Sequence, residues 1–325
     1  MNIIETRALS RSYGKRRAVD NLDMHVAAGE IYGFVGKNGA GKSTAMKMIA
    51  GLVNPSSGSI ELFGTQPRAQ RSGQEFSRVG ALIEDPGILP TFSALENLMC
   101  KAIAIGVVRP DAHCRELLEL VGLDDTGATR VKKFSLGMKQ RLGLALALVG
   151  GPDLLLLDEP FNGLDPESTR KMRNALVRLN RERGVTMVIS SHVLDQLDRM
   201  ATSFGVIRSG HMVRELSVDE LHQECGSSIR VRTSDPARAL AILEEELPGA
   251  ALRAEPDGSI IASAPARHAA ARFGGAAADP ASNATPSPED IARTLTDHGQ
   301  LILELAHVER DIEEYFVELM GGADA

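Results

Sequence analysis

Nine residues near the N-terminus, GKNGAGKST from Gly36 to Thr44, have the composition and spacing of a loop that binds phosphate groups. The glycines allow successive backbone N–H groups to point inward at an anion. Lys42 can reach the terminal phosphates of a nucleotide, and the Ser43 hydroxyl can ligate Mg²⁺. We therefore predict that a nucleoside triphosphate binds to one continuous segment that includes Gly36, Asn38, Gly39, Ala40, Gly41, Lys42, Ser43 and Thr44.

The segments on either side of this loop are the ones that such a site requires. EIYGFV, residues 30–35, is apolar enough for a buried strand, and AMKMIAGL, residues 45–52, is typical of a helix. The helix would then direct its positive N-terminal end at the phosphates. This context disfavours the alternative, an ordinary glycine-rich turn.

A pair of acidic residues, Asp158 and Glu159, follows a second apolar run, Leu154 to Leu157. Four consecutive leucines suit a strand that is buried on both faces of a parallel sheet. At the end of such a strand Asp158 can hold Mg²⁺ opposite Ser43. Glu159 can act as a general base toward water, a role that typically contributes about 10²- to 10⁴-fold in rate. Two solvated acids at a strand end are the alternative, which the phosphate loop makes less favourable.

These motifs and four others resemble the ATP-binding subunits of ABC transporters, over roughly residues 3–220. Tyr13 stands where that family stacks an aromatic ring on adenine. FSLGMKQRLGLA, residues 134–145, resembles the family signature, which is usually LSGGQ. FNGLDP, residues 161–166, resembles the loop that meets the other subunit, and SSH ends in His192, which resembles the switch histidine. The resemblance implies an α/β fold: a P-loop NTPase core of ABC type with a helical subdomain.

The signature departs from its common form. Ser135 and Gly137 are kept, whereas Leu136 replaces a glycine and Met138 replaces the glutamine. The residues that the family uses to contact the γ-phosphate, a small hydroxyl and a bare backbone, are therefore present, and the resemblance implies a functional site. Asn162 replaces a more usual serine or threonine in the interface loop.

Glu84 lies in ALIEDPGILP, residues 81–90, where the family usually has a glutamine that bridges Mg²⁺ and the attacking water to the membrane subunit. A carboxylate can make the same contacts, and its charge can strengthen the metal contact or pair with a basic residue of the partner. A solvated strand end is the alternative reading of the residues alone. With the SLGMKQR signature, this acid resembles exporters that protect bacteria from lantibiotics, bacitracin-like peptides and related drugs.

The resemblance also implies partners and a location. Two ATP-binding subunits sandwich two ATP molecules with Mg²⁺ across a two-fold interface, and a homodimer is expected. A separate transmembrane permease provides the membrane contact, so the chain would be cytoplasmic and peripheral at the inner face of the cell membrane. The longest nearly uncharged stretch, residues 142–157, is too short for a bilayer, which needs about 20 apolar residues.

The charge distribution separates the chain into two parts. From Ser227 onward it has 17 acidic residues against 8 arginines and no lysine, which argues against nucleic acid as a partner. We predict an ATPase domain over residues 1–220, with its helical subdomain at about 85–150, and an accessory domain over 221–325. The accessory domain reads as β-α-β-β-α-β, a small α+β split-βαβ fold, with a flexible, low-complexity linker at 264–288.

Two rival functions share some of these features. A soluble ABC ATPase of translation or DNA repair usually has two ATPase units or a long coiled-coil insertion, and this chain has neither. A regulator that senses ATP without hydrolysing it would not need Glu159 and His192. We therefore expect an ATPase, with Lys42, Ser43, Asp158, Glu159 and His192 in its reaction.

Overall fold

The structure is a computed structural model that describes residues 1–66, 74–192, 194–225, 227–248, 250–263, 287–309 and 312–321. The chain divides into two compact units, Met1–Val218 together with Glu318–Ala325, and Asp219–Val317. Among the described residues, no helix is both long and apolar enough to cross a membrane.

A six-stranded sheet forms the centre of the first unit, with the strand order β5-β6-β7-β3-β8-β9. Its strands are β3 (Ile31–Val35), β5 (Val79–Leu82), β6 (Leu154–Asp158), β7 (Thr186–Ser191), β8 (Ser203–Arg208) and β9 (His211–Ser217). The first five strands in this order run parallel, and β9 is antiparallel to β8. Because parallel strands end at the same edge, the loops that follow β5, β6, β7 and β3 lie next to one another.

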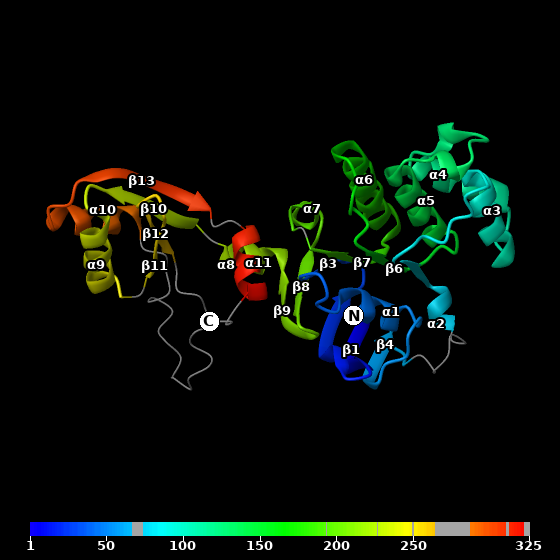
Figure 1. Cartoon of the computed structure of the whole chain (residues 1–325), viewed down its shortest axis with the longest axis horizontal. Coiled ribbons are helices and arrows are strands. Elements are labelled where there is room, and N and C mark those ends of the chain that lie inside the picture. The colour runs from blue at the N-terminus through cyan, green and yellow to red at the C-terminus, as the bar shows by residue number, and fades with distance from the viewer. Residues whose placement is uncertain are drawn as a thin grey trace. The chain divides into compact units, whose positions relative to one another are not determined.

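A second, antiparallel sheet has the order β2-β1-β4. Its strands are β1 (Asn2–Tyr13), β2 (Arg16–Ala27) and β4 (Ser57–Leu62). Helix α1 (Lys42–Ile49) lies between the two sheets (Figure 1), and its Met46 and Ile49 are fully buried in their common core. This helix begins three residues earlier than the sequence predicts, directly after Gly41, and ends before Gly51, whose φ of +67° is left-handed.

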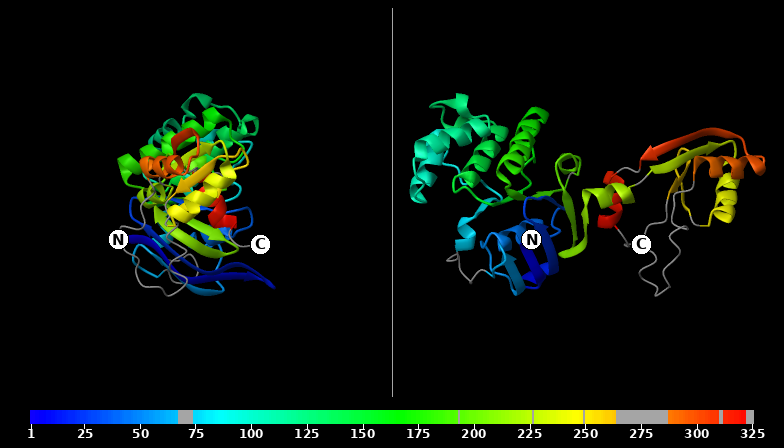
Figure 2. Two further views of the ribbon diagram at one scale, coloured as in Figure 1. Left: turned by 90° about the vertical axis from the view of Figure 1, so that its left-hand side faces the viewer. Right: turned by 180° about the vertical axis from the view of Figure 1, so that it is seen from behind.

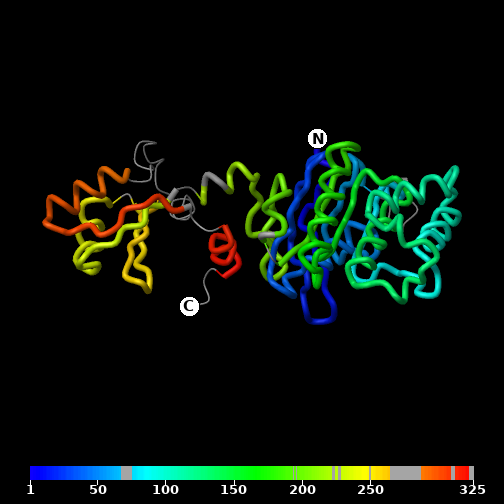
Figure 3. Tube along the Cα trace, turned by 90° about the horizontal axis from the view of Figure 1, so that it is seen from above, coloured from blue at the N-terminus to red at the C-terminus, as the bar shows by residue number. Residues whose placement is uncertain are grey.

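Helices also connect the strands of the first unit. They are α2 (Gln74–Ser77), α3 (Ala94–Ala104), α4 (Pro110–Leu120), α5 (Leu136–Leu148), α6 (Pro166–Arg183) and α7 (Asp195–Asp198), with 3₁₀ turns at Asp124–Thr126 and Val131–Lys133. Helices α3, α4 and α5 form the predicted helical region (Figures 1 and 3). At the start of α3, Ser93 and Glu96 form a capping box, in which each side chain binds the backbone N–H of the other residue.

The second unit contains the predicted β-α-β-β-α-β order. Its elements are β10 (Ser227–Thr233), α9 (Pro236–Glu246), β11 (Ala251–Ala254), β12 (Ile260–Ser263), α10 (Pro288–Asp297) and β13 (Ile302–Glu309), preceded along the chain by α8 (Val218–Glu224) and followed by α11 (Ile312–Gly321). The antiparallel sheet has the order β11-β12-β10-β13, and α9 and α10 cover one face of it (Figure 2). The predicted split-βαβ fold is confirmed. The predicted linker, 264–288, lies outside the described residues as far as residue 286.

Candidate functional site

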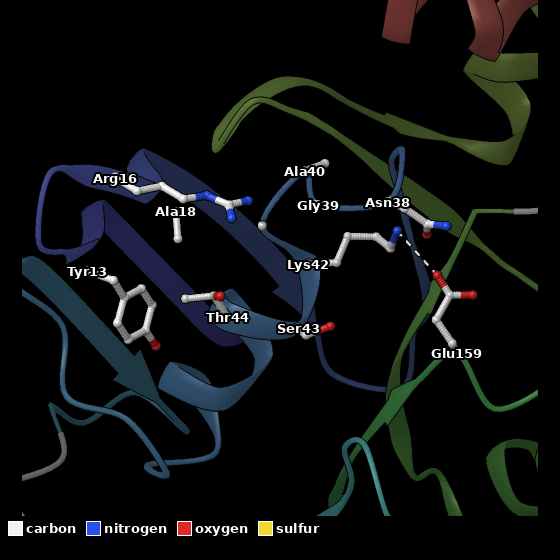
Figure 4. A pocket seen from close by; sticks show the side chains of 11 residues that line it. Tyr13, Arg16, Ala18, Asn38, Gly39, Ala40, Lys42, Ser43, Thr44 and Glu159 are labelled. Atoms are coloured by element: carbon white, nitrogen blue, oxygen red, sulfur yellow. Dashed lines mark ion pairs between the residues drawn. The ribbon is translucent and has the colours of Figure 1, made fainter.

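A pocket of about 420 Å³ lies between the phosphate-binding loop, the β1–β2 hairpin and the residue after β6 (Figure 4). The residues that line it are Tyr13, Arg16, Ala18, Asn38, Gly39, Ala40, Gly41, Lys42, Ser43, Thr44 and Glu159. The structure thus brings together eight of the residues predicted from sequence to bind nucleotide, along with the predicted base. Sequence analysis missed Arg16 and Ala18, although the alternation of polar and apolar residues from Asn21 to Val26 indicates a strand, and Gly14 before it indicates a turn.

The loop from Gly36 to Gly41 is held against the sheet so closely that side chains are excluded at its two ends. A Cβ atom on Gly36 would lie 2.6 Å from the carbonyl oxygen of Ile207 in β8, and one on Gly41 would lie 2.5 Å from that of Ala18. Gly41 also has a φ of +114°, which glycine adopts without strain. These glycines place the loop directly at the N-terminus of α1, where an anion is stabilised.

Lys42 is almost fully buried, and its ammonium group is held by oxygen atoms. Its Nζ donates to the carbonyl oxygen of Gly36 at 2.6 Å and to that of Lys37 at 3.4 Å. The same Nζ lies 3.2 Å from Oε1 of Glu159 (Figure 4). The charge of Lys42 is therefore offset by one carboxylate at the mouth of the pocket.

Glu159 connects the pocket with the end of β7. Its Oε2 lies 2.8 Å from Nδ1 of His192, and its backbone N–H donates to the Ser190 hydroxyl at 2.9 Å. That hydroxyl donates in turn to Oδ1 of Asp158 at 2.6 Å. Glu159 has a φ of +49°, a strained conformation for a residue with a side chain, and such strain is concentrated at functional sites. His192, which is 33 positions further along the chain, thus orients the carboxylate of Glu159.

Glu84 also follows a parallel strand with a left-handed backbone, at φ +61°. Its carboxylate, which is 65% exposed, pairs with Lys47 of α1, with Nζ and Oε1 2.5 Å apart. The acid that sequence analysis linked to Mg²⁺ or to a basic residue of another subunit is thus paired with a lysine of its own chain. Glu84 is not among the residues that line the pocket.

The signature segment begins α5 at a distance from the pocket lining. The Ser135 hydroxyl accepts the backbone N–H of Met138 at 3.2 Å and thereby caps the helix. Gly137 faces α6, and a Cβ atom there would lie 2.5 Å from the Ser168 hydroxyl. Leu136, the residue that replaces a glycine of the common signature, is half exposed. Neither Ser135 nor Gly137 contacts the pocket that the chain forms by itself.

The loop after Phe161 ends at Asp165, which caps α6. Its Oδ1 accepts the backbone N–H groups of Glu167 and Ser168 at 3.1 and 3.0 Å. Hydrogen bonds from the side chain and backbone of Ser168 hold the pKa of the Asp165 carboxyl below its usual range. The carboxylate is therefore ionised at neutral pH, and it caps α6 as an anion, which the N-terminal end of a helix stabilises.

The donor atoms of the site fit Mg²⁺. Ser43 and Asp158 supply hydroxyl and carboxylate oxygens, the hard ligands that this ion prefers. In the described part of the chain, no group of three or more His, Cys, Asp and Glu side chains could hold a metal ion by itself. Mg²⁺ is typically bound by one or two protein oxygens together with substrate phosphates and water.

Comparison with known proteins gives concordant results for the sequence. A profile of the family described as ABC transporter matches residues 19–162. The chain is 35% identical over 320 residues to the bacitracin transport ATP-binding protein BcrA of Bacillus licheniformis, with 98% of each chain covered. It is 39% identical over 217 residues to the lantibiotic transport ATP-binding protein SrtF of Streptococcus pyogenes, covering 67% of this chain and 92% of SrtF.

Solved structures give the same fold. The ATP-binding cassette MJ0796 bound to ADP and Pi has a TM-score of 0.61 at 22% identity, covering 66% of this chain and 98% of that chain. A structure described as the ATP binding subunit of an ABC transporter has a TM-score of 0.61 at 27% identity, covering 68% and 92%. Both matches cover about two thirds of this chain.

Proposed function

Because this chain belongs to the ATP-binding subunits of ABC transporters and hydrolyses ATP, we propose that it drives a separate permease that exports an antimicrobial peptide or drug. ATP hydrolysis is supported by the position of Glu159, whose carboxylate contacts both Lys42 and His192 at the mouth of the pocket. The observation that carries the substrate class is the identity to a bacitracin transport protein along almost the entire length of both chains.

ATP binding is proposed to use the residues that line the pocket. Tyr13, at the end of β1, would stack on the adenine, and the backbone from Gly36 to Thr44 would surround the phosphates. Lys42 would contact the β- and γ-phosphates with the Nζ that now contacts Glu159. An anionic phosphate and the Glu159 carboxylate therefore compete for one cation.

Hydrolysis is proposed to use Glu159 as the base that orients and polarises the attacking water. His192 holds one carboxylate oxygen at 2.8 Å, which limits the rotation of the side chain. Ser43 and Asp158 would hold Mg²⁺, with Glu84 as a further metal and coupling contact. The bound metal would supply charge neutralisation at the phosphates.

The position of the signature supports a second ATP-binding subunit, since Ser135 is exposed at the start of α5 whereas Gly137 is buried against α6. Ser135 and Gly137 do not reach the pocket of their own chain, and we propose that they contact the γ-phosphate bound by a second copy in a two-fold dimer. The permease would provide the membrane contact, so we place the chain in the cytoplasm, peripheral at the inner face of the cell membrane. We expect no nucleic-acid partner.

The decisive experiment for this function uses a producing or resistant bacterium. The tagged chain is purified from detergent-solubilised membranes, and a polytopic membrane protein should co-purify with it. Replacing the chromosomal copy with Glu159→Gln should leave that co-purification intact and should abolish resistance to peptide antibiotics of the bacitracin and lantibiotic classes. Unchanged resistance in this variant would refute a role in peptide export.

A further inference from the structure

We propose that Arg16 is a further substrate-binding residue, whose guanidinium contacts the phosphate chain of the nucleotide and supplies the unpaired positive charge of the pocket. This inference rests on the proposed ATP site, and it adds a residue that lies outside the phosphate-binding loop and outside all the motifs described above.

The β1–β2 hairpin places Arg16 beside the adenine end of the pocket. Tyr13 and Arg16 are directly opposite each other in the antiparallel ladder, across a turn of Gly14 and Lys15. Residues in this relationship point their side chains to the same face of the sheet. Both side chains accordingly line the pocket, Tyr13 with its ring and Arg16 with its guanidinium (Figure 4).

From the hairpin, the Arg16 side chain reaches across to the phosphate-binding loop. In Figure 4 its guanidinium points towards Gly39 and Ala40. A Cβ atom on Gly39 would lie 3.7 Å from Nη2 of Arg16. The guanidinium thus lies where it would just touch a side chain at position 39, close to the segment whose backbone would surround the phosphates and across the pocket from Glu159 (Figure 4).

Arg16 differs from the other charged residues that line the pocket in having no ion-pair partner among the residues that the structure describes. The lining contains two cations, Arg16 and Lys42, and one anion, Glu159. Lys42 is paired with Glu159, whereas no acidic side chain in the described part of the chain forms an ion pair with Arg16. Its neighbour Arg17 differs, because it pairs with Asp20 at 2.8 Å. The positive charge that remains in the pocket is therefore that of Arg16.

Arginine presents a planar fork of N–H donors that suits a phosphate group. Charge-assisted hydrogen bonds of this kind are about twice as strong as neutral ones, and for an exposed side chain we expect about a tenfold contribution to affinity. Because part of this gain is the screened attraction of free charges, it should decrease as the salt concentration rises.

The test measures ADP and ATP binding to the full chain by isothermal titration calorimetry at several KCl concentrations, with ATP measured in a Glu159→Gln background. Arg16→Ala should weaken both nucleotides about tenfold and reduce the salt dependence of the affinity, and Arg16→Lys should restore most of that salt dependence. Arg17→Ala is the matched control, since it removes the same charge one residue away and should match the parent.

Two results would overturn the proposal. One is an Arg16→Ala affinity equal to that of Arg17→Ala, and the other is a loss of affinity whose salt dependence equals that of the parent, since that would indicate a structural effect. Lys42→Ala separates this inference from the proposed function. If Lys42→Ala abolishes binding and Arg16→Ala does not change it, the ATP site stands and only the role of Arg16 is wrong.

Discussion

Oε1 of Glu159 lies 3.2 Å from Nζ of Lys42, so the predicted general base and the predicted phosphate-binding cation contact each other directly. The contact joins the end of β6 to the start of α1 across the carboxyl edge of the sheet. It gives the two side chains opposite effects on nucleotide affinity, because the carboxylate attracts the same ammonium group that a phosphate needs.

Glu159→Gln should therefore separate binding from hydrolysis. The amide keeps the shape of the side chain, removes the charge beside Lys42 and cannot act as a base. We expect tighter ATP binding than in the parent and a hydrolysis rate lower by about 10²-fold or more. Calorimetry and phosphate release measure the two quantities, and Glu182→Gln, on the exposed face of α6, is the control. Hydrolysis at the parental rate would exclude Glu159 as the base.

Glu84→Gln should retain ATP binding and change the coupling between hydrolysis and transport. Replacing the carboxylate by an amide weakens its 2.5 Å ion pair with Lys47 and restores the residue that is usual in the family. The measurement compares ATPase activity and peptide resistance in the same cells. If mutant and parent have equal ATPase activity and equal resistance, the acid has no special role.

Gly137→Ala should destabilise the contact between α5 and α6. The added Cβ would lie 2.5 Å from Oγ and 2.9 Å from Cβ of Ser168, so one of the two helices must shift. Overpacking of this kind typically costs about 1–3 kcal/mol. Ser168→Gly makes room for the methyl group, so the double variant should be more stable than the sum of the single effects predicts. Additive effects in urea unfolding would show that the clash is absent.

Tyr32 should make the stability of the chain depend on alkaline pH. Burial, together with the nearby carboxylate of Glu215, which accepts the Tyr32 hydroxyl at 2.7 Å, raises the pKa of Tyr32 well above its ordinary value of 10.0. Because the folded pKa is the higher one, the contribution of Tyr32 is complete below the unfolded pKa and is lost as the pH rises from there towards the folded pKa.

Urea unfolding of the parent and of Tyr32→Phe tests whether the stabilising contribution of Tyr32 is lost as the pH rises. At neutral pH the variant should be less stable by about 0.5–1.5 kcal/mol because it lacks the hydrogen bond. The difference should shrink as the pH rises above about 10. Tyr13→Phe, in which the changed residue is half exposed, should follow the parent throughout. A difference between parent and Tyr32→Phe that is constant with pH would contradict the assignment.

Local signals in the sequence predicted much of this molecule. The phosphate-binding loop can be recognised because its glycines lie between an apolar strand segment and a helical segment. The Ser93–Glu96 capping box can be recognised because the two residues are three positions apart. The leucine run before Asp158 predicts a buried strand because each side of it meets apolar neighbours. Each of these features depends on residues within one turn or one strand of each other.

Contacts between distant segments were not predictable in the same way. The pairing of Glu84 with Lys47 depends on the neighbouring placement of the β5 end and α1, which no spacing encodes. Arg16 enters the pocket because a two-residue turn sets it opposite Tyr13, and a hairpin one residue longer would direct it elsewhere. The strand register and the tertiary packing thus determine the partner of Glu84 and the position of Arg16, which the motifs alone do not predict.

The most direct test of the account is the magnesium-dependent affinity of the purified chain for ATP, measured by calorimetry in the parent, Lys42→Ala and the control Lys171→Ala, whose side chain lies on the exposed face of α6. The account predicts binding that needs magnesium in the parent and the control, and loss of both binding and turnover in Lys42→Ala. Affinity and turnover that survive the removal of Lys42, or a parent that does not bind ATP with magnesium, would contradict it.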